Sequence, residues 1–382
     1  MNKEELIKEY EKHHFNGDPE ALEILLAAVI ANYMEGAPVW LLFIGASGAG
    51  KSSVVEMFDE HESTLSLDDL SDKAMQSGLE GKAEDDNLVN QLDGRVGLIS
   101  DFAQIISAKD SNILLSQLRR IYDGSLTKAW GSHKAMASWK GKVGLLAAST
   151  DAIDSKMKVF QELGERFNRV NIKGGKEARK QASKLAIKNL DRKAEIKKSL
   201  KCSGHAFLDN YIAIAKEGYE VVIAEDLQEQ IRVMADITAI LRTPIQGKKG
   251  GGFDHIPEPE YGTRLGQQLG MIAKANALLE GEHCVGEPDM VLASRVAMDA
   301  IPRIRTQIVS ALLHGEDKQV EIRGFGNLPK KNVERSLDEL QALGIIYYPK
   351  ARSIHLTPDV VENLGMSGLD EKIKQAYPRI EY

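Results

Sequence analysis

Hydrophobic and polar positions along the chain alternate between helical spacing and short continuous apolar runs. Residues 1–36 carry apolar side chains three and four positions apart, with a break at Asn16–Pro19, which predicts helices on either side of a turn. Three apolar runs follow, at Val39–Ile44, Val96–Ile99 and Val143–Ala148. Such runs are typical of strands buried on both faces. Because a helical pattern at Ser111–Tyr122 separates two of them, the chain predicts a parallel α/β sheet.

The second half of the chain is mainly helical in its spacing. Residues 173–201 are strongly basic, with nine lysines and two arginines against three acidic residues. This segment is either a solvated amphipathic helix or an arm that contacts phosphates. Helical spacing continues to about Arg242, and a loop rich in glycine and proline is expected over 246–262. Helices are expected again at Thr263–Glu280 and about Pro288–His314.

From about residue 296 the pattern changes to helix, short strand, helix and two short strands. We expect a helix over Met298–Leu313, a strand at Val320–Ile322, and a helix that starts near Asn327–Pro329 and ends at Gly344. Two strands, Ile345–Tyr348 and Ser353–Leu356, are expected around a basic turn. The chain therefore divides into an N-terminal helical segment, an α/β core, a helical region and a C-terminal module, at 1–36, 37–172, 173–295 and 296–382.

Composition limits the class of protein. The 382 residues include only two cysteines, which excludes a disulfide scaffold and favours a reducing compartment. Because no apolar run reaches about 18 residues and the N-terminus is charged, we expect a cytoplasmic protein with no membrane span. The net charge of −7 argues against a uniformly basic nucleic-acid coat but not against a local basic surface. Cys202 and His205 lie far along the chain from His283 and Cys284, so a zinc site is not expected.

The strongest motif is Gly45-Ala-Ser-Gly-Ala-Gly-Lys-Ser52, between a predicted strand and a predicted helix. It satisfies the phosphate-loop pattern, in which glycines let backbone N–H groups surround phosphate oxygens. Lys51 is expected to bridge the β- and γ-phosphates of ATP, and the Ser52 hydroxyl to bind Mg²⁺. The expected nucleotide contacts are Gly45, Ser47, Gly48, Ala49, Gly50, Lys51, Ser52 and Ser53. A chance glycine turn before a helix is the alternative.

Asp101 follows the second apolar run and is the first candidate for a metal-holding acid. A carboxylate at the end of a strand beside the phosphate-loop strand can hold Mg²⁺ through water. The alternative is that Asp101 only caps a helix. A glutamate usually follows such an acid as the base that activates water, but Phe102 stands there. Hydrolysis is therefore expected to be slow or to use another base, for which Asp68 and Asp69 are weak candidates.

The order of elements after Asp101 resembles that of the AAA+ ATPases, and most of all the minichromosome maintenance helicases. The matching elements are an acid-tipped strand, a helix, a lysine-bearing hairpin over 125–139, a polar strand end at Ser149–Thr150, and Arg166 followed by phenylalanine. Residues 259–277, PEYGTRLGQQLGMIAKANA, resemble the lid helix of that family. The chain also looks like P-loop proteins of bacteria and phages that have Asp-Phe after the second strand.

The resemblance implies an AAA+-like parallel-sheet core, a helical lid and a C-terminal winged helix. It also implies roles for single residues. Thr150, or Ser149, matches the phosphate sensor, and Arg166 matches an arginine that reaches the γ-phosphate in a neighbouring subunit. Arg264 matches the arginine of the lid that contacts phosphate in its own subunit. Surface ion pairs are the alternative for both arginines.

Two basic features are expected to face DNA. Lys128, His133 and Lys134 lie on the expected hairpin, and solvated charges are the alternative for them. Trp130 is a candidate for base stacking, although a packing role is favoured for it. The order of elements at the C-terminus resembles a winged helix-turn-helix, with DNA contacts expected from Lys330, Lys331, Arg335, Lys350 and Arg352. Docking of a protein partner, or a purely structural role, is the alternative for this module.

These expectations describe an ATP- and Mg²⁺-dependent DNA motor, a helicase, translocase or DNA-remodelling ATPase. It is expected to act as a ring-shaped, hexamer-type homo-oligomer in a bacterium, phage or mobile element. The alternative is an ATP-switched, DNA-binding regulator or scaffold with slow or no hydrolysis. Phe102 favours the regulator, whereas the hairpin favours the motor. A RecA-like ATPase in which Arg264 has no lid role is a third possibility. The N-terminal segment is too short for the DNA-binding collar of the helicases that the chain resembles.

Overall fold

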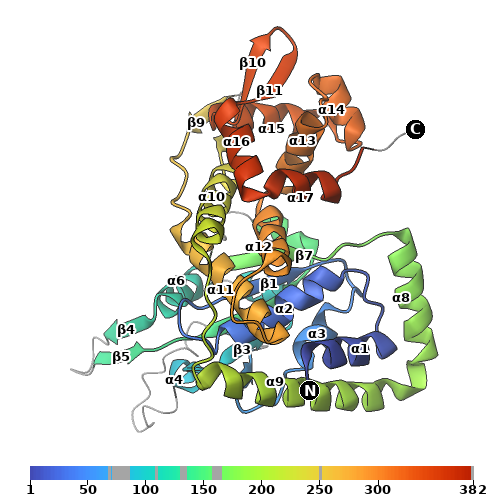
Figure 1. Cartoon of the computed structure of the whole chain (residues 1–382), viewed down its shortest axis with the longest axis vertical. Helices are drawn as coiled ribbons and strands as arrows, with labels where there is room; N and C mark the ends of the chain where they lie inside the picture. The colour runs from blue at the N-terminus through green and yellow to red at the C-terminus, as the bar shows by residue number, and fades with distance from the viewer. Residues whose placement is uncertain are drawn as a thin grey trace. The chain divides into compact units, whose positions relative to one another are not determined.

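The computed structural model describes residues 1–67, 70, 87–107, 111–129, 136–156, 166–248 and 252–379. The chain divides into two compact units, whose elements are labelled in Figure 1. The first unit comprises Met1–Val222 and Met271–Cys284, and the second comprises Ile223–Gly270 and Val285–Tyr382.

The first unit is built on a five-stranded parallel sheet, which confirms the predicted α/β class. In spatial order its strands are β2 (Thr64–Ser66), β3 (Val96–Ile99), β6 (Gly144–Ser149), β1 (Trp40–Ile44) and β7 (Phe167–Asn171). Every residue of β1, β3 and β6 is buried, as in a sheet that is covered on both faces. Since β6 lies between β1 and β3, one strand separates the strand before Asp101 from the phosphate-loop strand.

An aromatic cluster joins β1 to the elements beside it. Trp40, at the start of β1, is fully buried, and its indole N–H donates a hydrogen bond to the Val143 carbonyl at 2.7 Å. The rings of Tyr122 and Phe167 lie 5.2 Å and 5.1 Å from the Trp40 ring. Because a buried tryptophan needs a partner for its N–H, this contact fixes how β1 and β6 start side by side.

The N-terminal helices are α1 (Lys3–His13) and α2 (Pro19–Ala31), with the predicted break between them. Asn2 caps α1 by accepting a hydrogen bond from the Glu5 N–H at 2.9 Å. In the break, the Asp18 carboxylate accepts a hydrogen bond from the Lys173 N–H, just after β7, at 2.7 Å. The other helices of this unit are α3 (Lys51–Glu56), α4 (Leu88–Leu92), α5 (Phe102–Ser107), α6 (Ser111–Tyr122), α8 (Lys176–Lys188) and α9 (Lys193–Lys216), with 3₁₀ turns η2 (Asp151–Lys156) and η3 (Leu190–Arg192).

The predicted hairpin is present as β4 (Ser125–Ala129) paired antiparallel with β5 (Met136–Lys140). Its root is anchored in the core, since Leu126 and Trp139 are buried and face each other in the register. The tip, with Trp130, His133 and Lys134, lies outside the described residues, and so do Asp68 and Asp69.

The second unit begins with α10 (Glu225–Arg242), which is followed by a short hairpin of β8 (Gln246–Gly247) and β9 (Phe253–His255) within the predicted loop. Next come α11 (Thr263–Glu280), whose last turns belong to the first unit, α12 (Glu287–Ala300) and α13 (Arg303–Leu313). The expected single helix at Pro288–His314 is therefore wrong. Pro302 restricts the residue before it to extended backbone, and Ile301 has φ −79° and ψ 136°.

The C-terminal elements are α14 (Gln319–Phe325), α15 (Lys330–Ala342), β10 (Ile346–Lys350), β11 (Ser353–Leu356), α16 (Pro358–Ser367) and α17 (Leu369–Ala376). The predicted helix up to Gly344 and the two strands after it are confirmed. The predicted strand at Val320–Ile322 is wrong, because these residues belong to α14. In a strand both side chains would share one face, whereas Val320 is 74% exposed and Ile322 is fully buried.

A buried arginine links three helices of the second unit. Arg305 of α13 is paired with Glu339 of α15 at 3.0 Å. Its guanidinium also donates to the carbonyls of Leu241 and Thr243, at the end of α10, at 2.7 Å and 2.8 Å. Because the charge is both paired and hydrogen-bonded, its burial is compensated, and α10, α13 and α15 are held together.

Candidate nucleotide-binding site

The loop from Gly45 to Gly50 leaves the end of β1 and leads into α3. The Gly45 N–H donates a hydrogen bond to the carbonyl of Ser149, at the end of β6, at 3.2 Å. Gly48 and Gly50 have φ of 79° and 80°, the left-handed region that glycine enters without strain. A side chain at position 50 would also meet the Tyr10 hydroxyl of α1 at 2.9 Å. Glycine is therefore required at position 50 on two grounds.

The backbone of this loop offers a set of unused hydrogen-bond donors. The Ala49 N–H closes a turn onto the Ala46 carbonyl at 3.2 Å, and the predicted contact of Ala49 with a nucleotide stays a prediction. Residues 46–49 are exposed. Within the described part of the chain, no protein acceptor is found for the N–H groups of Ser47, Gly48, Gly50, Lys51, Ser52 and Ser53. Such an array of donors fits a polyanion such as a triphosphate.

Lys51 lies at the centre of this arrangement and is only 8% exposed. Its ammonium donates hydrogen bonds to the carbonyls of Gly45 and Ala46, both at 2.7 Å. Burial lowers the pKa of Lys51, and the nearby carboxylates of Asp151 and Asp101 oppose that shift. The lysine is therefore bound to the loop and lies within electrostatic range of two carboxylates.

Asp101 is exposed at the end of β3, one residue before α5. Its carboxylate accepts a hydrogen bond from the Ala103 N–H at 3.1 Å, as the capping alternative predicts. The same carboxylate also favours the charged form of Lys51, and its role in a metal site stays a prediction. Both roles are compatible, because a carboxylate has lone pairs for more than one partner.

Phe102, at the position where a glutamate base was expected, faces the hydrophobic core. It is fully buried, and its ring lies 4.9 Å from the Phe167 ring. Position 102 therefore offers no group to the exposed end of the sheet. A catalytic carboxylate, if the site has one, has to come from another element.

Asp151 is the acid that sequence reasoning missed. It follows Ser149 and Thr150 at the end of β6, where η2 begins, and it is exposed. In the sheet register Ser149 is level with Ile44, so Asp151 follows β6 where the phosphate loop follows β1. The sequence signal was present as the polar run Ser149-Thr150-Asp151 after a buried strand, but only the strand order shows its proximity to the loop. Ser149 is buried, whereas Thr150 is half-buried.

Arg166, the predicted arginine finger, is engaged within its own subunit. It is 8% exposed, and its guanidinium is paired with the Asp123 carboxylate at 2.7 Å. The same group lies 5.6 Å from the centre of the Tyr122 ring, within the range of a cation–π contact. These contacts favour the ion-pair alternative in this conformation, and the role in a neighbouring site stays a prediction.

The remaining predicted residues of the second unit are partly or fully exposed. Arg264 is half-buried in the first turn of α11. The five cations predicted to meet DNA are all exposed: Lys330, Lys331, Arg335, Lys350 and Arg352. Arg335 is paired with Glu339 at 2.8 Å, and Lys330 with Glu334 at 3.7 Å. The β10–β11 hairpin also exposes Tyr347 and Tyr348, which were not among the predicted DNA contacts.

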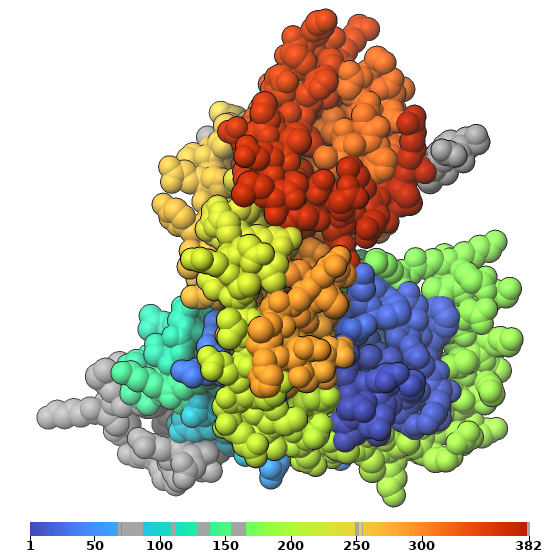
Figure 2. All heavy atoms as spheres, in the orientation of Figure 1, coloured from blue at the N-terminus to red at the C-terminus, as the bar shows by residue number. Residues whose placement is uncertain are grey.

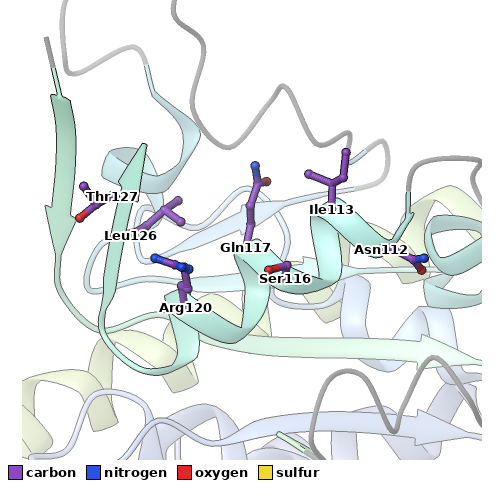
Figure 3. Close-up of a pocket in the computed structure, with 7 residues that line it drawn as sticks. All are labelled: Asn112, Ile113, Ser116, Gln117, Arg120, Leu126 and Thr127. Carbon is purple, nitrogen blue, oxygen red and sulfur yellow. The ribbon is translucent and has the colours of Figure 1, made fainter. Parts of the chain in front are cut away.

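The described part of the chain also has a pocket of about 370 Å³ between α6 and β4, at the root of the β4–β5 hairpin (Figure 3). Its lining residues are Asn112, Ile113, Ser116, Gln117, Arg120, Leu126 and Thr127. None of the predicted nucleotide contacts lines it. Lys128 follows in β4, whereas His133 and Lys134 lie outside the described residues.

The histidines of the two Cys-His pairs contact different backbone carbonyls. His205 contacts the Asp59 carbonyl at 2.8 Å, and His283 contacts the Glu220 carbonyl at 3.1 Å. Across the described residues, no group of three or more His, Cys, Asp and Glu side chains is arranged to hold a metal ion.

None of the helices in the described ranges combines the length and apolar character that crossing a membrane requires. Comparison of the chain with protein-family models and with curated proteins finds no match in either. The assignment of this site therefore depends on its residues and geometry.

Proposed function

We propose that the chain is an ATPase of the AAA+ type that binds DNA and acts on it as a ring-shaped homo-oligomer. The observation that carries this proposal is the phosphate loop at the end of β1, with unused N–H donors around it and Lys51 bound to the loop within electrostatic range of two carboxylates. The position of β6 between β1 and β3 supports it, because the polar end of β6 then lies between the loop and Asp101.

On this proposal Lys51 leaves the Gly45 and Ala46 carbonyls and binds the β- and γ-phosphates of ATP. The Ser52 hydroxyl and the Asp101 carboxylate are exposed oxygen donors of the kind that Mg²⁺ prefers, so the residues fit that ion. Magnesium, when bound, neutralises phosphate charge. Thr150 contacts the γ-phosphate from the end of β6.

We assign the proton-accepting role to Asp151. Water attacks the γ-phosphorus, its proton passes to the Asp151 carboxylate, and the bond from the γ-phosphorus to the bridging oxygen breaks to release ADP. The assignment depends on two observations: Phe102 is buried, and Asp151 is exposed beside Lys51.

DNA binding is assigned to the C-terminal module. α13, α14 and α15 followed by the β10–β11 hairpin have the order of a winged helix, with α15 in the place of a recognition helix. Lys330, Lys331 and Arg335 are exposed on α15, and the hairpin turn exposes Lys350 and Arg352. In this proposal Arg264 belongs to a helical lid over the nucleotide.

A second candidate is an ATP-switched, DNA-binding regulator with little turnover. Two observations favour it: Phe102 is buried, and Arg166 is paired with Asp123. The site then lacks a carboxylate at position 102 and a free arginine at position 166, and groups of these two kinds speed hydrolysis in other nucleoside triphosphatases.

Phosphate release and mass photometry, each with and without duplex DNA, test the two candidates. The ATPase proposal expects a ring-sized species and DNA-stimulated release that falls by about a hundredfold or more in Asp151→Asn. ATP binding should persist in this variant, and Asp191→Asn, an exposed aspartate in η3, serves as the matched control. ATP-dependent DNA binding without turnover by a monomer or dimer would support the regulator instead.

A further inference from the structure

The basic helix α8 is unusual in having no buried residue along its 13 positions. One side is half covered, through Ala178, Gln181, Ala182 and Leu185, which recur at helical spacing. The helix is joined to the rest of its unit at its end, where the Asn189 amide donates to the His13 carbonyl at 2.9 Å. In Figures 1 and 2 it forms the light-green edge of the first unit, beyond α1. An isolated helix of this length is only marginally stable without packing. The exposed face of α8 is therefore a candidate binding surface.

Four lysines form a stripe along the exposed side of α8: Lys176, Lys180, Lys184 and Lys188. They are four residues apart, so neighbouring lysines are separated by about 6 Å along the helix axis. Like charges at this spacing destabilise a helix by about 0.2–0.5 kcal/mol for each pair. The stripe therefore costs stability, which an anionic ligand would offset.

Within the described residues, none of these four lysines has an acidic partner. The only acidic residue of α8, Glu177, accepts a hydrogen bond from Gln181 at 2.7 Å. Three of the five lysines elsewhere in the basic segment are paired: Lys173 with Glu20 at 3.4 Å, Lys197 with Glu56 at 2.8 Å and Lys201 with Asp59 at 3.1 Å. Most of the lysines of the segment that have no acidic partner among the described residues therefore lie on α8.

We propose that the lysine stripe of α8 binds the phosphate backbone of a nucleic acid. The stripe carries positive charges at a regular spacing, and a nucleic acid strand carries negative phosphates at a regular spacing. The lysine spacing is close to the rise of about 6.8 Å over two nucleotides of one DNA strand. Lysine side chains are long and flexible enough to absorb the difference. The inference extends the proposed DNA binding and rests on it.

The test compares two quadruple variants of the full chain. In the first, the four lysines of the stripe are replaced by glutamine, which preserves helix propensity and removes the charges. In the control, four exposed lysines outside α8 are replaced in the same way, with the same change in net charge: Lys8, Lys12, Lys216 and Lys318. Binding of a fluorescent 40-base-pair duplex is measured by anisotropy between 50 and 300 mM salt, and ATP binding is measured in parallel.

We expect the stripe variant to bind the duplex at least about tenfold more weakly at low salt. The slope of the logarithm of the binding constant against the logarithm of the salt concentration should become shallower by about 2–4. The control should stay within about twofold of the wild type, and ATP binding should not change in either variant. The melting temperature of the stripe variant should be equal or higher, because repulsion along α8 is removed.

Three results would overturn the inference. Equal DNA binding by the stripe variant and the wild type, or binding of the stripe to anionic vesicles or an acidic protein instead of DNA, would refute the role of α8 alone. A wild-type chain that binds ATP but no DNA would refute both the role of α8 and the DNA part of the proposed function.

Discussion

Replacement of Phe102 by glutamate tests whether position 102 faces the core or the catalytic site. In the sequence pattern a glutamate at this position would complete the site and increase hydrolysis. In the structure the side chain is fully buried and packs on Phe167. We therefore expect Phe102→Glu to unfold the first unit, with no gain in activity.

The magnitude follows from two contributions. Loss of a buried phenylalanine side chain costs about 3–5 kcal/mol in typical cores. A buried carboxyl group has to stay protonated, and protonation of a glutamate at pH 7 costs about 4 kcal/mol from its ordinary pKa. The total is comparable to the whole stability of an ordinary domain, about 5–15 kcal/mol. Phe102→Leu keeps an apolar side chain and should cost about 1–2 kcal/mol.

Tryptophan fluorescence during thermal and urea unfolding is the assay, together with phosphate release. The three tryptophans of the chain all fall within residues 1–222, so the signal reports on the first unit. A Phe102→Glu variant that melts with the wild type and releases phosphate faster would refute the core position of this side chain and the role given to Asp151.

Three further predictions concern charged groups. Arg166→Ala should lower the stability of the monomer by about 1–2 kcal/mol in unfolding experiments, because it removes the contacts with Asp123 and Tyr122; an unchanged monomer with a lower ATPase rate would favour the arginine finger. Burial lowers the pKa of Lys142 to about 8 from 10.5, so unfolded chains bind more protons than folded ones between these values. Stability in urea should therefore rise by about 1–2 kcal/mol over this pH range in the wild type but not in Lys142→Met, and a flat wild-type profile would contradict the burial. Burial also lowers the pKa of Lys51, and phosphate favours its charged form, so calorimetry should show proton uptake on ATP binding at alkaline pH, which Lys51→Met abolishes.

The sequence predicted the parts of the fold that depend on local pattern. Buried strands such as Trp40–Ile44 appear in the sequence as continuous apolar runs, because both faces of the sheet are covered there. The loop at Gly45–Ser52 could be recognised because its glycines and lysine occur at a fixed spacing. The β4–β5 hairpin and the helix that ends before Gly344 also followed from local signals, since Gly344 has the left-handed φ of 72° that ends helices.

The parts that depend on spatial neighbours did not follow from the sequence. The order of strands put β6 between β1 and β3, which gave Asp151 a place beside Lys51 that spacing along the chain does not reveal. The burial of Phe102 depends on Phe167, 65 positions later in the chain. The helix α14 was taken for a strand because three residues are too few to distinguish the two periodicities.

Calorimetric titration of ATP·Mg²⁺ into the wild-type chain and into Lys51→Ala tests the central claim most directly. The loop geometry predicts one nucleotide bound per chain, with an affinity that falls by at least about tenfold when the lysine is removed. No binding by a folded wild-type chain, or equal binding by both proteins, would contradict the assignment of the loop after β1 as a nucleotide site.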